Sequence, residues 1–388
     1  MDADDVVRLR LRGQQLREPF AATVDEAVRN LLAVQSQEFP YARWTLAQRT
    51  AGASAADVEQ AVSDGTILRT HILRPTWHFV HRDDLRWLLA LSAPRLHQGN
   101  SGMYRRSGID SADGARSNCV LAAAVAGGAH KTREQLAAAL LTAGFADGGL
   151  GLAYRIMFAE ASGVLVSGVP GRSAGGALRQ TYALFDERVP AARAGLMDRP
   201  LALAELVRRY FTSRGPATEK DCADWSGLTV ADIRAGLRLA REAAPGSLDP
   251  TVIDGLVFYA RPTPDAGDAG DAGDAGGGDF SGAGTGQAGT RQAGRIDLIQ
   301  CYDEYVMGYS RSRHFLGGTA PFAPVAGQPM HLVLRDGRLA GVWRHSFVRG
   351  RCELDIRLQP GTGADRGQSI EAAVAAYAGF LGMPAVRL

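Results

Sequence analysis

LLAVQSQEFP, at residues 31–40, is the stretch that decides how the N-terminal part of this chain is interpreted. Upstream, Thr23 and Glu26 have the spacing of a capping box, so a helix is predicted to begin there. Apolar residues recur at helical spacing as far as Gln35. Pro40 is expected to stop the helix, because the residue before a proline avoids the α region. Gln35 is therefore predicted to face inward near a helix end.

Two glutamines flank a small residue in this stretch, as Gln35-Ser36-Gln37. Residues two apart on a helix point roughly 200° apart. Gln35 and Gln37 can therefore share a site only if the helix frays or ends between them, which Pro40 favours. The alternative is a pair of polar residues at a helix end, satisfied by backbone groups.

Composition and length set broad limits on the chain. Its 388 residues are typical of two to three domains, and its net charge of +2 does not by itself indicate a nucleic-acid partner. Without a run of 18 apolar residues or a signal-peptide core, we expect no membrane association and a cytoplasmic protein. The spacing of the 4 cysteines and 8 histidines predicts no disulfide set, no metal and no cofactor.

Helical segments followed by short hairpin-like stretches repeat along the chain, which predicts an α+β fold. Helices followed by a β-hairpin have the order of a winged helix, and we expect three such units in tandem. Their predicted boundaries are 1–100, 101–195 and 196–261. Residues 262–294 are rich in Gly, Ala and Asp and are predicted to be a disordered insert. Residues 295–388 are predicted to form a β-rich domain with a final helix.

Local signals support parts of this outline. Thr132 and Gln135 predict a capped helix, and Gly227 predicts the turn of a helix-turn-helix. Asp336-Gly337 is typical of the centre of a hairpin turn.

An acid pair, Asp303-Glu304, lies in a segment that is predicted to be extended. Two carboxylates can serve a glycosidase-like reaction. Neighbouring residues on a strand point to opposite faces, however, so the two cannot easily cooperate. We therefore expect Asp303 near a site and Glu304 in a structural role.

Four sequence blocks occur in a characteristic order: QSQ at 35–37, THILRPTWHFV at 70–80, RGPATEKDCADWSGLT at 214–229 and LIQCYDEYVMGYSRSR at 298–313. Together they resemble the winged-helix DNA glycosylase family typified by AlkZ. The family signature is Gln, a variable residue, then Gln, and a sister branch has Asp at the last position. The resemblance implies a C-shaped array of winged helices around a DNA channel, with Gln35 and Gln37 as the catalytic residues.

Basic and polar residues on the hairpins and helix ends are the candidates for DNA or substrate contacts. Arginine and histidine on a wing suit phosphates or a minor groove, and helix N-termini bind phosphate. The alternatives are solvated strands, a mobile loop, a hydrogen-bonded core histidine and a plain capped helix. The candidates are Arg69, His71, Arg74, His78, Arg172, Arg179, Arg214, Thr218 and Asp303.

The chemistry of glutamine limits the reactions that these two residues can catalyse. A glutamine can hold and orient water but cannot deprotonate it, so the leaving group must already be activated. N7- or N3-alkylated purines are cationic, and positioning a water near C1′ would then supply the rate. We therefore expect a monofunctional DNA glycosylase, a monomer that acts on double-stranded DNA carrying alkylpurine lesions and is associated with the nucleoid through that DNA. Lys131 and Lys220 lie outside the first unit, which argues against a Schiff-base lyase.

The resemblance further implies bulky adducts and interstrand crosslinks made by DNA-alkylating natural products, and hence repair that gives self-resistance. Two other classes of function stay open at this point. A non-enzymatic winged-helix transcription regulator would bind DNA without releasing a base. A protein that sequesters a toxic small molecule would bind the drug without DNA.

Overall fold

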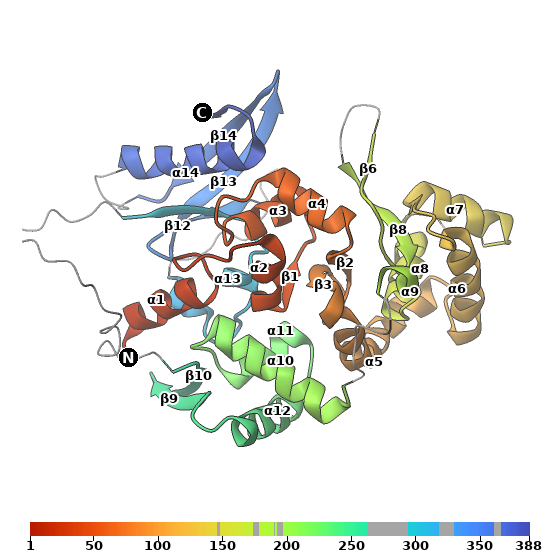
Figure 1. Cartoon of the computed structure of the whole chain (residues 1–388), viewed down its shortest axis with the longest axis horizontal. Coiled ribbons are helices and arrows are strands. Elements are labelled where there is room, and N and C mark those ends of the chain that lie inside the picture. The colour runs from red at the N-terminus through yellow and green to blue at the C-terminus, as the bar shows by residue number, and fades with distance from the viewer. Residues whose placement is uncertain are drawn as a thin grey trace, which may run out of the picture.

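The computed structural model describes residues 1–145, 148–173, 178–189, 191, 197–262, 294–317, 330–360 and 366–388. Helices and small sheets alternate through these ranges, which confirms the predicted α+β class (Figure 1). The predicted insert at 262–294 falls almost wholly outside the described residues. Within the described ranges, no helix has both the length and the apolar character needed to cross a bilayer.

The first unit contains the glutamine motif. After α1 (Ala3–Gly13), its elements are α2 (Val24–Leu31), β1 (Ala33–Gln35), α3 (Phe39–Ala47), α4 (Ala55–Ser63), β2 (Ile67–His71) and β3 (Trp77–His81). The three strands form a sheet in the order β1-β3-β2, with Gln35 of β1 opposite His78 of β3. The motif therefore begins on an edge strand.

The prediction that one helix continues through Gln35 to Pro40 is wrong. Thr23 does cap α2, by accepting the N–H of Glu26, but the helix stops at Leu31. Leu32 then adopts a φ of 65°, which takes the chain out of the helix and into β1. Pro40 lies in the first turn of α3, where a missing N–H costs no hydrogen bond.

The same order of elements recurs in the second unit. It contains α6 (Ser111–Val125), β4 (Lys131–Thr132), α7 (Arg133–Thr142), α8 (Gly149–Ala161), β5 (Leu165–Ser167) and β8 (Thr181–Leu184), after the long connecting helix α5 (Arg82–Arg106). Between β5 and β8 lie the short strands β6 (Gly171–Arg172) and β7 (Leu178–Arg179), and α9 (Phe185–Arg188) follows β8. The sheet order β4-β8-β5 repeats that of the first unit. The predicted capping box of Thr132 and Gln135 is confirmed.

The third unit is a variation on this order. It contains α10 (Arg199–Arg214), α11 (Glu219–Ser226), α12 (Val230–Ala243), β9 (Asp249–Ile253) and β10 (Leu256–Ala260). A single bridge between Ala217 and Tyr259 stands where the other units have their first strand. Gly227 makes the predicted turn between α11 and α12, with a φ of 70°.

The C-terminal part is a five-stranded sheet covered by a helix. Its elements are β11 (Ile296–Ile299), α13 (Glu304–Met307), the 3-10 helix η2 (Arg313–Leu316), β12 (His331–Arg335), β13 (Arg338–Val348), β14 (Arg351–Leu358), α14 (Arg366–Leu381) and β15 (Ala385–Arg387). Asp336-Gly337 forms the predicted turn, with φ values of 50° and 78°. The extended segment expected around Asp303 is wrong, because Asp303 caps α13 by accepting the N–H of Tyr305.

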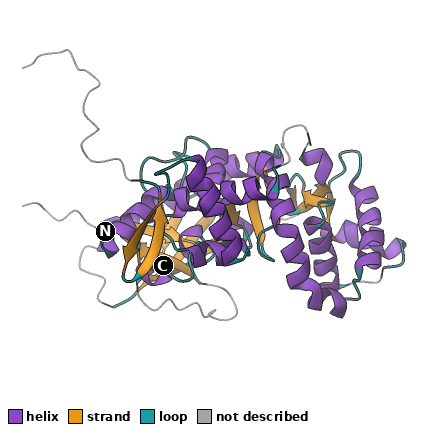
Figure 2. Ribbon diagram, turned by 90° about the horizontal axis from the view of Figure 1, so that it is seen from below, coloured by secondary structure: helices purple, strands orange, loops and turns teal. Residues whose placement is uncertain are grey.

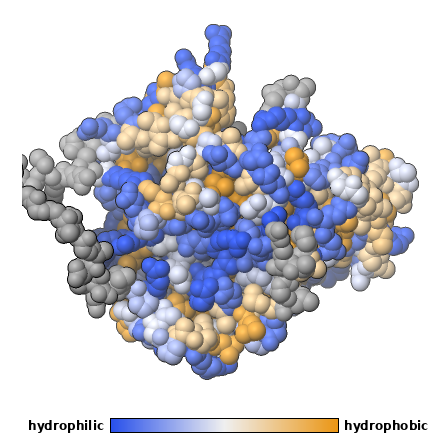
Figure 3. Space-filling view, viewed as in Figure 1, coloured by the Kyte–Doolittle hydropathy of each residue, from blue (hydrophilic) through white to orange (hydrophobic). Residues whose placement is uncertain are grey.

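The units differ in how closely they join the rest of the molecule. Helices α6, α7 and α8 stand at one end in both views (Figures 1 and 2). The first unit instead shares a core with the C-terminal sheet, in which Trp44 of α3 packs against Tyr377 and Phe380 of α14. The centre of the face drawn in Figure 3 is mainly hydrophilic. The glutamine motif therefore lies next to α3, which is anchored to the C-terminal part through this shared core.

Two histidines of the C-terminal sheet enclose a tyrosine of α3. The ring centroid of Tyr41 lies 3.6 Å from that of His331 and 4.2 Å from that of His345. Burial lowers the pKa of His331 to about 3 and that of His345 to about 4. The Nδ1 atom of His345 lies 2.6 Å from the Tyr377 hydroxyl. Both imidazoles are therefore neutral in the folded protein at pH 7.

This stack should make the fold sensitive to acid. The pKa of His345 is about 4 in the folded chain against a usual value of 6.5, so the unfolded chain takes up the proton first. Its contribution to stability is present above pH 6.5 and is lost as the pH falls toward 4. We expect His345→Phe, which keeps a ring on Tyr41, to show a smaller decrease in melting temperature between neutral and acid pH. Calorimetry at both pH values measures this, and an equal decrease would contradict it.

Candidate functional site

Gln35 and Gln37 lie at the end of β1 and in the loop that follows it. Gln35 is buried, with 2% of its surface exposed, whereas Gln37 is exposed. Two hydrogen bonds to the backbone of Trp77 hold the loop to β3. The N–H of Ser36 donates to the Trp77 carbonyl at 2.7 Å, and the backbone N–H of Trp77 donates to the Gln37 carboxamide oxygen at 3.4 Å. The motif thus offers one glutamine in a protected position and one that solvent can reach.

Arg74 links Gln35 to His78. Its Nη2 atom donates to the Gln35 carboxamide oxygen at 3.0 Å and lies 3.5 Å from Nε2 of His78. Nδ1 of His78 lies 2.9 Å from the Thr76 carbonyl, which can only accept, so we place the proton on Nδ1. Burial, and then the charge of Arg74, lower the pKa of His78 well below its usual range. His78 is therefore a neutral acceptor at pH 7 and carries no proton to donate from Nε2.

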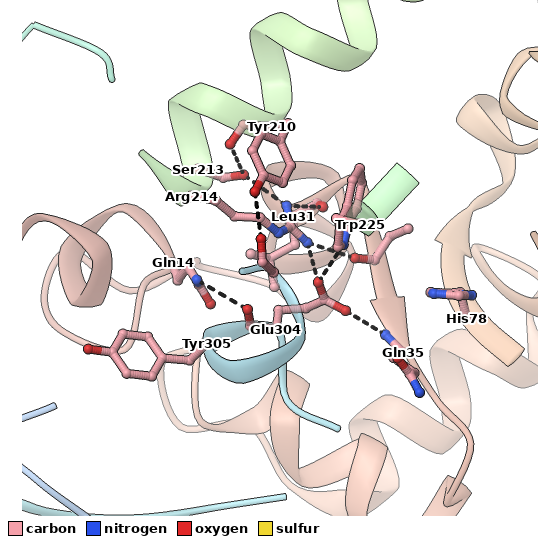
Figure 4. Close-up of polar contacts among 12 residues, drawn as sticks. Gln14, Leu31, Gln35, His78, Tyr210, Ser213, Arg214, Trp225, Glu304 and Tyr305 are labelled. Carbon is pink, nitrogen blue, oxygen red and sulfur yellow. Dashed lines mark hydrogen bonds and ion pairs between the residues drawn. The ribbon is translucent and has the colours of Figure 1, made fainter. Parts of the chain in front are cut away.

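A buried carboxylate holds the backbone of Gln35 (Figure 4). One oxygen of Glu304 accepts the N–H of Gln35 at 2.8 Å. The other accepts from Arg214 Nη2 at 2.6 Å and from the indole N–H of Trp225 at 2.8 Å. Glu304 and Arg214 are both fully buried. The C-terminal part and the third unit thereby fix the position of the motif.

Arg214, a candidate DNA contact, uses its charge inside the protein. Its Nη1 donates to the carbonyl of Leu31 at 2.8 Å, and its Nη2 donates to that of Ala33 at 3.0 Å. These carbonyls flank Leu32, whose positive φ breaks the helix before β1. The expectation of a phosphate contact at Arg214 does not fit this burial. Arg214 instead stabilises the bend at Leu32, where the chain passes from α2 into β1 and the motif.

Arg69 supports the other side of the motif. Its Nε and Nη2 atoms donate to the Ser36 carbonyl at 3.0 and 2.8 Å, and Nη2 reaches the Gln37 carbonyl at 3.3 Å. The guanidinium lies 4.4 Å from the centre of the Trp77 ring. Burial lowers the pKa of Arg69 to about 10, so it stays charged at pH 7. With only 5% of its surface exposed, it positions the loop and presents little charge to a ligand.

The two carboxylates of the acid pair have different partners. Asp303 forms a fully buried ion pair with Arg49, with oxygen-to-nitrogen distances of 2.6 and 3.0 Å. It has no contact with Gln35 among the hydrogen bonds of the described residues. Glu304, which was expected to have a structural role, holds the Gln35 backbone. The cause is the helix α13, which turns the two side chains differently from a strand.

The other candidate residues fall into two groups. Thr218 and His71 are buried: Thr218 forms a capping box with Asp221, and Nδ1 of His71 contacts the Glu160 carboxylate. The N-terminus of α11 thus already has an internal carboxylate where a phosphate was envisaged. The second group, Arg172 and Arg179, is exposed on the hairpin of β6 and β7, where Arg172 pairs with Glu59 at 2.5 Å. The tip of that hairpin, at 174–177, lies outside the described residues.

Two neighbours of the motif were not identified from sequence. Glu38 directly follows Gln37, is half-buried, and has a pKa raised by burial. Its carboxylate lies 3.5 Å from Nε2 of His331. Gln300 donates to the Gln35 carbonyl at 3.4 Å and to the Thr45 hydroxyl at 2.6 Å. Gln300 and His331 are distant from the motif in sequence, so the sequence could not show that they lie beside it. Glu38 could have been identified, because it directly follows Gln37.

The chain is similar to known DNA glycosylases in sequence and in fold. The family model described as DNA glycosylase AlkZ-like matches residues 28–380. Among solved structures, the DNA glycosylase AlkZ of Streptomyces sahachiroi matches with a TM-score of 0.73 and 19% sequence identity, over 100% of this chain and 100% of its own. No curated protein sequence matches the chain. The family resemblance of the four sequence blocks is thereby confirmed, and the structural match shows a shared fold.

The buried pair of Glu304 and Arg214 predicts a large mutational effect. Glu304→Gln keeps an acceptor for the Gln35 N–H but leaves the Arg214 cation without its counter-charge. We expect this to lower the free energy of unfolding by about 3–5 kcal/mol. The matched control is Glu242→Gln, whose exposed partner Arg238 lies 3.9 Å away, and its cost should stay within about 1 kcal/mol. Urea unfolding measures both, and similar costs for the two variants would refute the role of the pair.

Proposed function

Because the chain belongs to the AlkZ-like DNA glycosylase family, we propose that it hydrolyses the N-glycosidic bond of cationic N7- or N3-alkylated purines in double-stranded DNA. The observation that carries the proposal is the motif Gln35-Ser36-Gln37, whose backbone is held from both sides by Arg69 and Glu304. A rigid support of this kind suits residues whose task is to position a water molecule.

The two glutamines would have different tasks. Gln37 is exposed, so its carboxamide can bind the water that attacks C1′. Gln35 is oriented by Arg74, and it would orient that water or contact the sugar. Neutral His78 has no proton on Nε2, and a guanidinium such as that of Arg74 retains its protons, so neither supplies a proton to a leaving base. This polar but non-acidic arrangement favours a base that already carries a positive charge.

We also propose that the three repeated units are winged helices, with boundaries at 1–100, 101–195 and 196–261, and that they line a channel for DNA. The sheet orders β1-β3-β2 and β4-β8-β5 support this, since the first strand of each unit, β1 or β4, pairs with the last strand, β3 or β8. The β6–β7 and β13–β14 hairpins project toward the same side in Figure 1, beyond α3 and α4. Their exposed arginines, which suit phosphate contacts, include Arg172, Arg179 and Arg351.

The proposed enzyme is a monofunctional monomer. Its proposed physiological substrates are bulky natural-product adducts or interstrand crosslinks, whose removal would give repair and self-resistance to a genotoxin. No lysine lies in the motif or among the residues that hold it, which is consistent with hydrolysis by water and not through a Schiff base.

Substitution of the motif tests the assignment of the site. We expect Gln37→Ala to lower the single-turnover rate of N7-methylguanine release at least tenfold, with DNA affinity little changed, because the residue positions water and does not anchor phosphate. Gln35→Ala should be similar or less severe. Gln60→Ala, an exposed glutamine on α4, is the control. Wild-type rates in both motif variants would show that the site is elsewhere.

The charge of the leaving base should decide which lesions are released. We expect excision of N7-alkylguanine and N3-alkyladenine, and none of uracil, 8-oxoguanine or 1,N6-ethenoadenine. Positioning supplies at most about 7–11 kcal/mol, which suffices only for a good leaving group. Chromatography of bases released from defined duplexes measures this. Efficient release of uracil would require a proton donor in the site, and Glu38, with its raised pKa beside Gln37, would be the first residue to substitute.

A further inference from the structure

A small crevice lies between the first and second units, next to the glutamine motif. Its volume is about 60 Å³. Most of its lining is apolar and includes Phe39, Val62, Pro170 and Leu178, with Arg69 and Arg179 as its charged residues. Sites that enclose a whole small molecule typically have volumes of about 300–1,000 Å³, so this crevice can hold only a part of a ligand. The crevice is therefore suited to one ring or a short alkyl chain.

Its wall is continuous with the motif. Arg69, which lines the crevice, donates to the carbonyls of Ser36 and Gln37. Phe39, also in the lining, follows Gln37 by two residues. A group in the crevice would therefore lie close to a base positioned at the two glutamines.

The walls are joined to each other by polar contacts. The Ser167 hydroxyl of β5 accepts the N–H of Arg69 on β2 at 2.8 Å. Arg172 of β6 pairs with Glu59 of α4 at 2.5 Å, and Arg188 of α9 donates to the Val62 carbonyl at 2.7 Å. These contacts connect the first and second units on either side of the crevice.

Charge at the crevice favours a particular occupant. Arg179 is exposed, and its Nη1 atom lies 4.0 Å from the Glu134 carboxylate, which is a long distance for an ion pair. An apolar lining with a cationic rim complements an apolar group attached to a polyanion, because the group can be buried while a phosphate meets the arginine. A second apolar protein surface would leave Arg179 without such a partner.

We propose that this crevice binds the apolar substituent, aromatic or alkyl, of an N-alkylated purine in DNA while the purine itself lies at Gln35 and Gln37. The proposal rests on the proposed function and assigns a specificity site to it. Methyl lesions would not reach the crevice, so its contribution appears only with larger adducts. Phe39 is half-buried and contributes an aromatic ring to the lining.

The test fills the crevice and compares two lesions. Leu178→Trp adds bulk to the lining, and Leu178→Ala removes it. The expected result is that the ratio of kcat/KM for N7-benzylguanine over N7-methylguanine falls at least tenfold in Leu178→Trp and less in Leu178→Ala. Leu141→Trp, a change of the same kind at an exposed position of α7, should leave the ratio within twofold of wild type. A ratio within twofold of wild type in Leu178→Trp would overturn the proposal.

A binding measurement separates this proposal from the proposed function. Duplexes with a 2′-fluoro sugar resist depurination, so the affinities for the benzyl and methyl lesions can be compared by fluorescence anisotropy without cleavage. A benzyl preference that Leu178→Trp abolishes supports the crevice even if no base is released from ordinary duplexes, in which case only the hydrolysis proposal fails. Equal affinities for the two lesions in the wild type would overturn the crevice even if N7-methylguanine is excised.

Discussion

The ion pair between Arg214 and Glu304 is the interaction on which the arrangement of the site depends. Additional hydrogen bonds offset the cost of removing two charges from water, and Arg214 and Glu304 make several, although Nε of Arg214 has no hydrogen-bond partner among the described residues. Both terminal nitrogens of Arg214 donate to protein acceptors, and both oxygens of Glu304 accept from protein donors. Those partners include the carbonyls on either side of Leu32 and the N–H of Gln35. One buried pair thus supports both the bend into β1 and the first catalytic candidate.

Three arginines around the motif donate to groups of the motif or of the residues that lead into it. Arg69 and Arg214 bind backbone carbonyls, and Arg74 binds the carboxamide of Gln35. The nearby cation and burial keep His78 neutral. A site built in this way has strong directional support but little acid–base capacity near neutral pH. This combination is consistent with a reaction whose difficulty lies in placing water and not in activating the base.

Sequence reasoning succeeded where the structure is decided locally. Thr132 with Gln135, Gly227, and Asp336-Gly337 form the elements expected of them, because a cap or a turn depends on a few neighbouring residues. It failed at Gln35, which helical spacing assigned to a helix. There the pairing with His78 on β3 and the bonds from Arg214 prevail, and both partners are distant in sequence. The segment around Asp303 and Glu304 was wrongly expected to be extended for a related reason, since a short helix that ends in the interior leaves little periodicity to recognise. The pairing of Gln35 with Gln37 in one site came from family resemblance, and their catalytic roles stay a prediction.

The edge position of β1 has a consequence for how the molecule forms during synthesis. Domains of a growing chain generally fold from the N-terminus as they emerge. Here the short strand β1 is completed by a carboxylate from α13, which is synthesised long after the first unit. A ribosome-bound chain that stops before residue 304 contains both glutamines but lacks the group that fixes the backbone of the first. The motif can therefore reach its final geometry only late in translation, so that partial chains carry the sequence signature without the organised site.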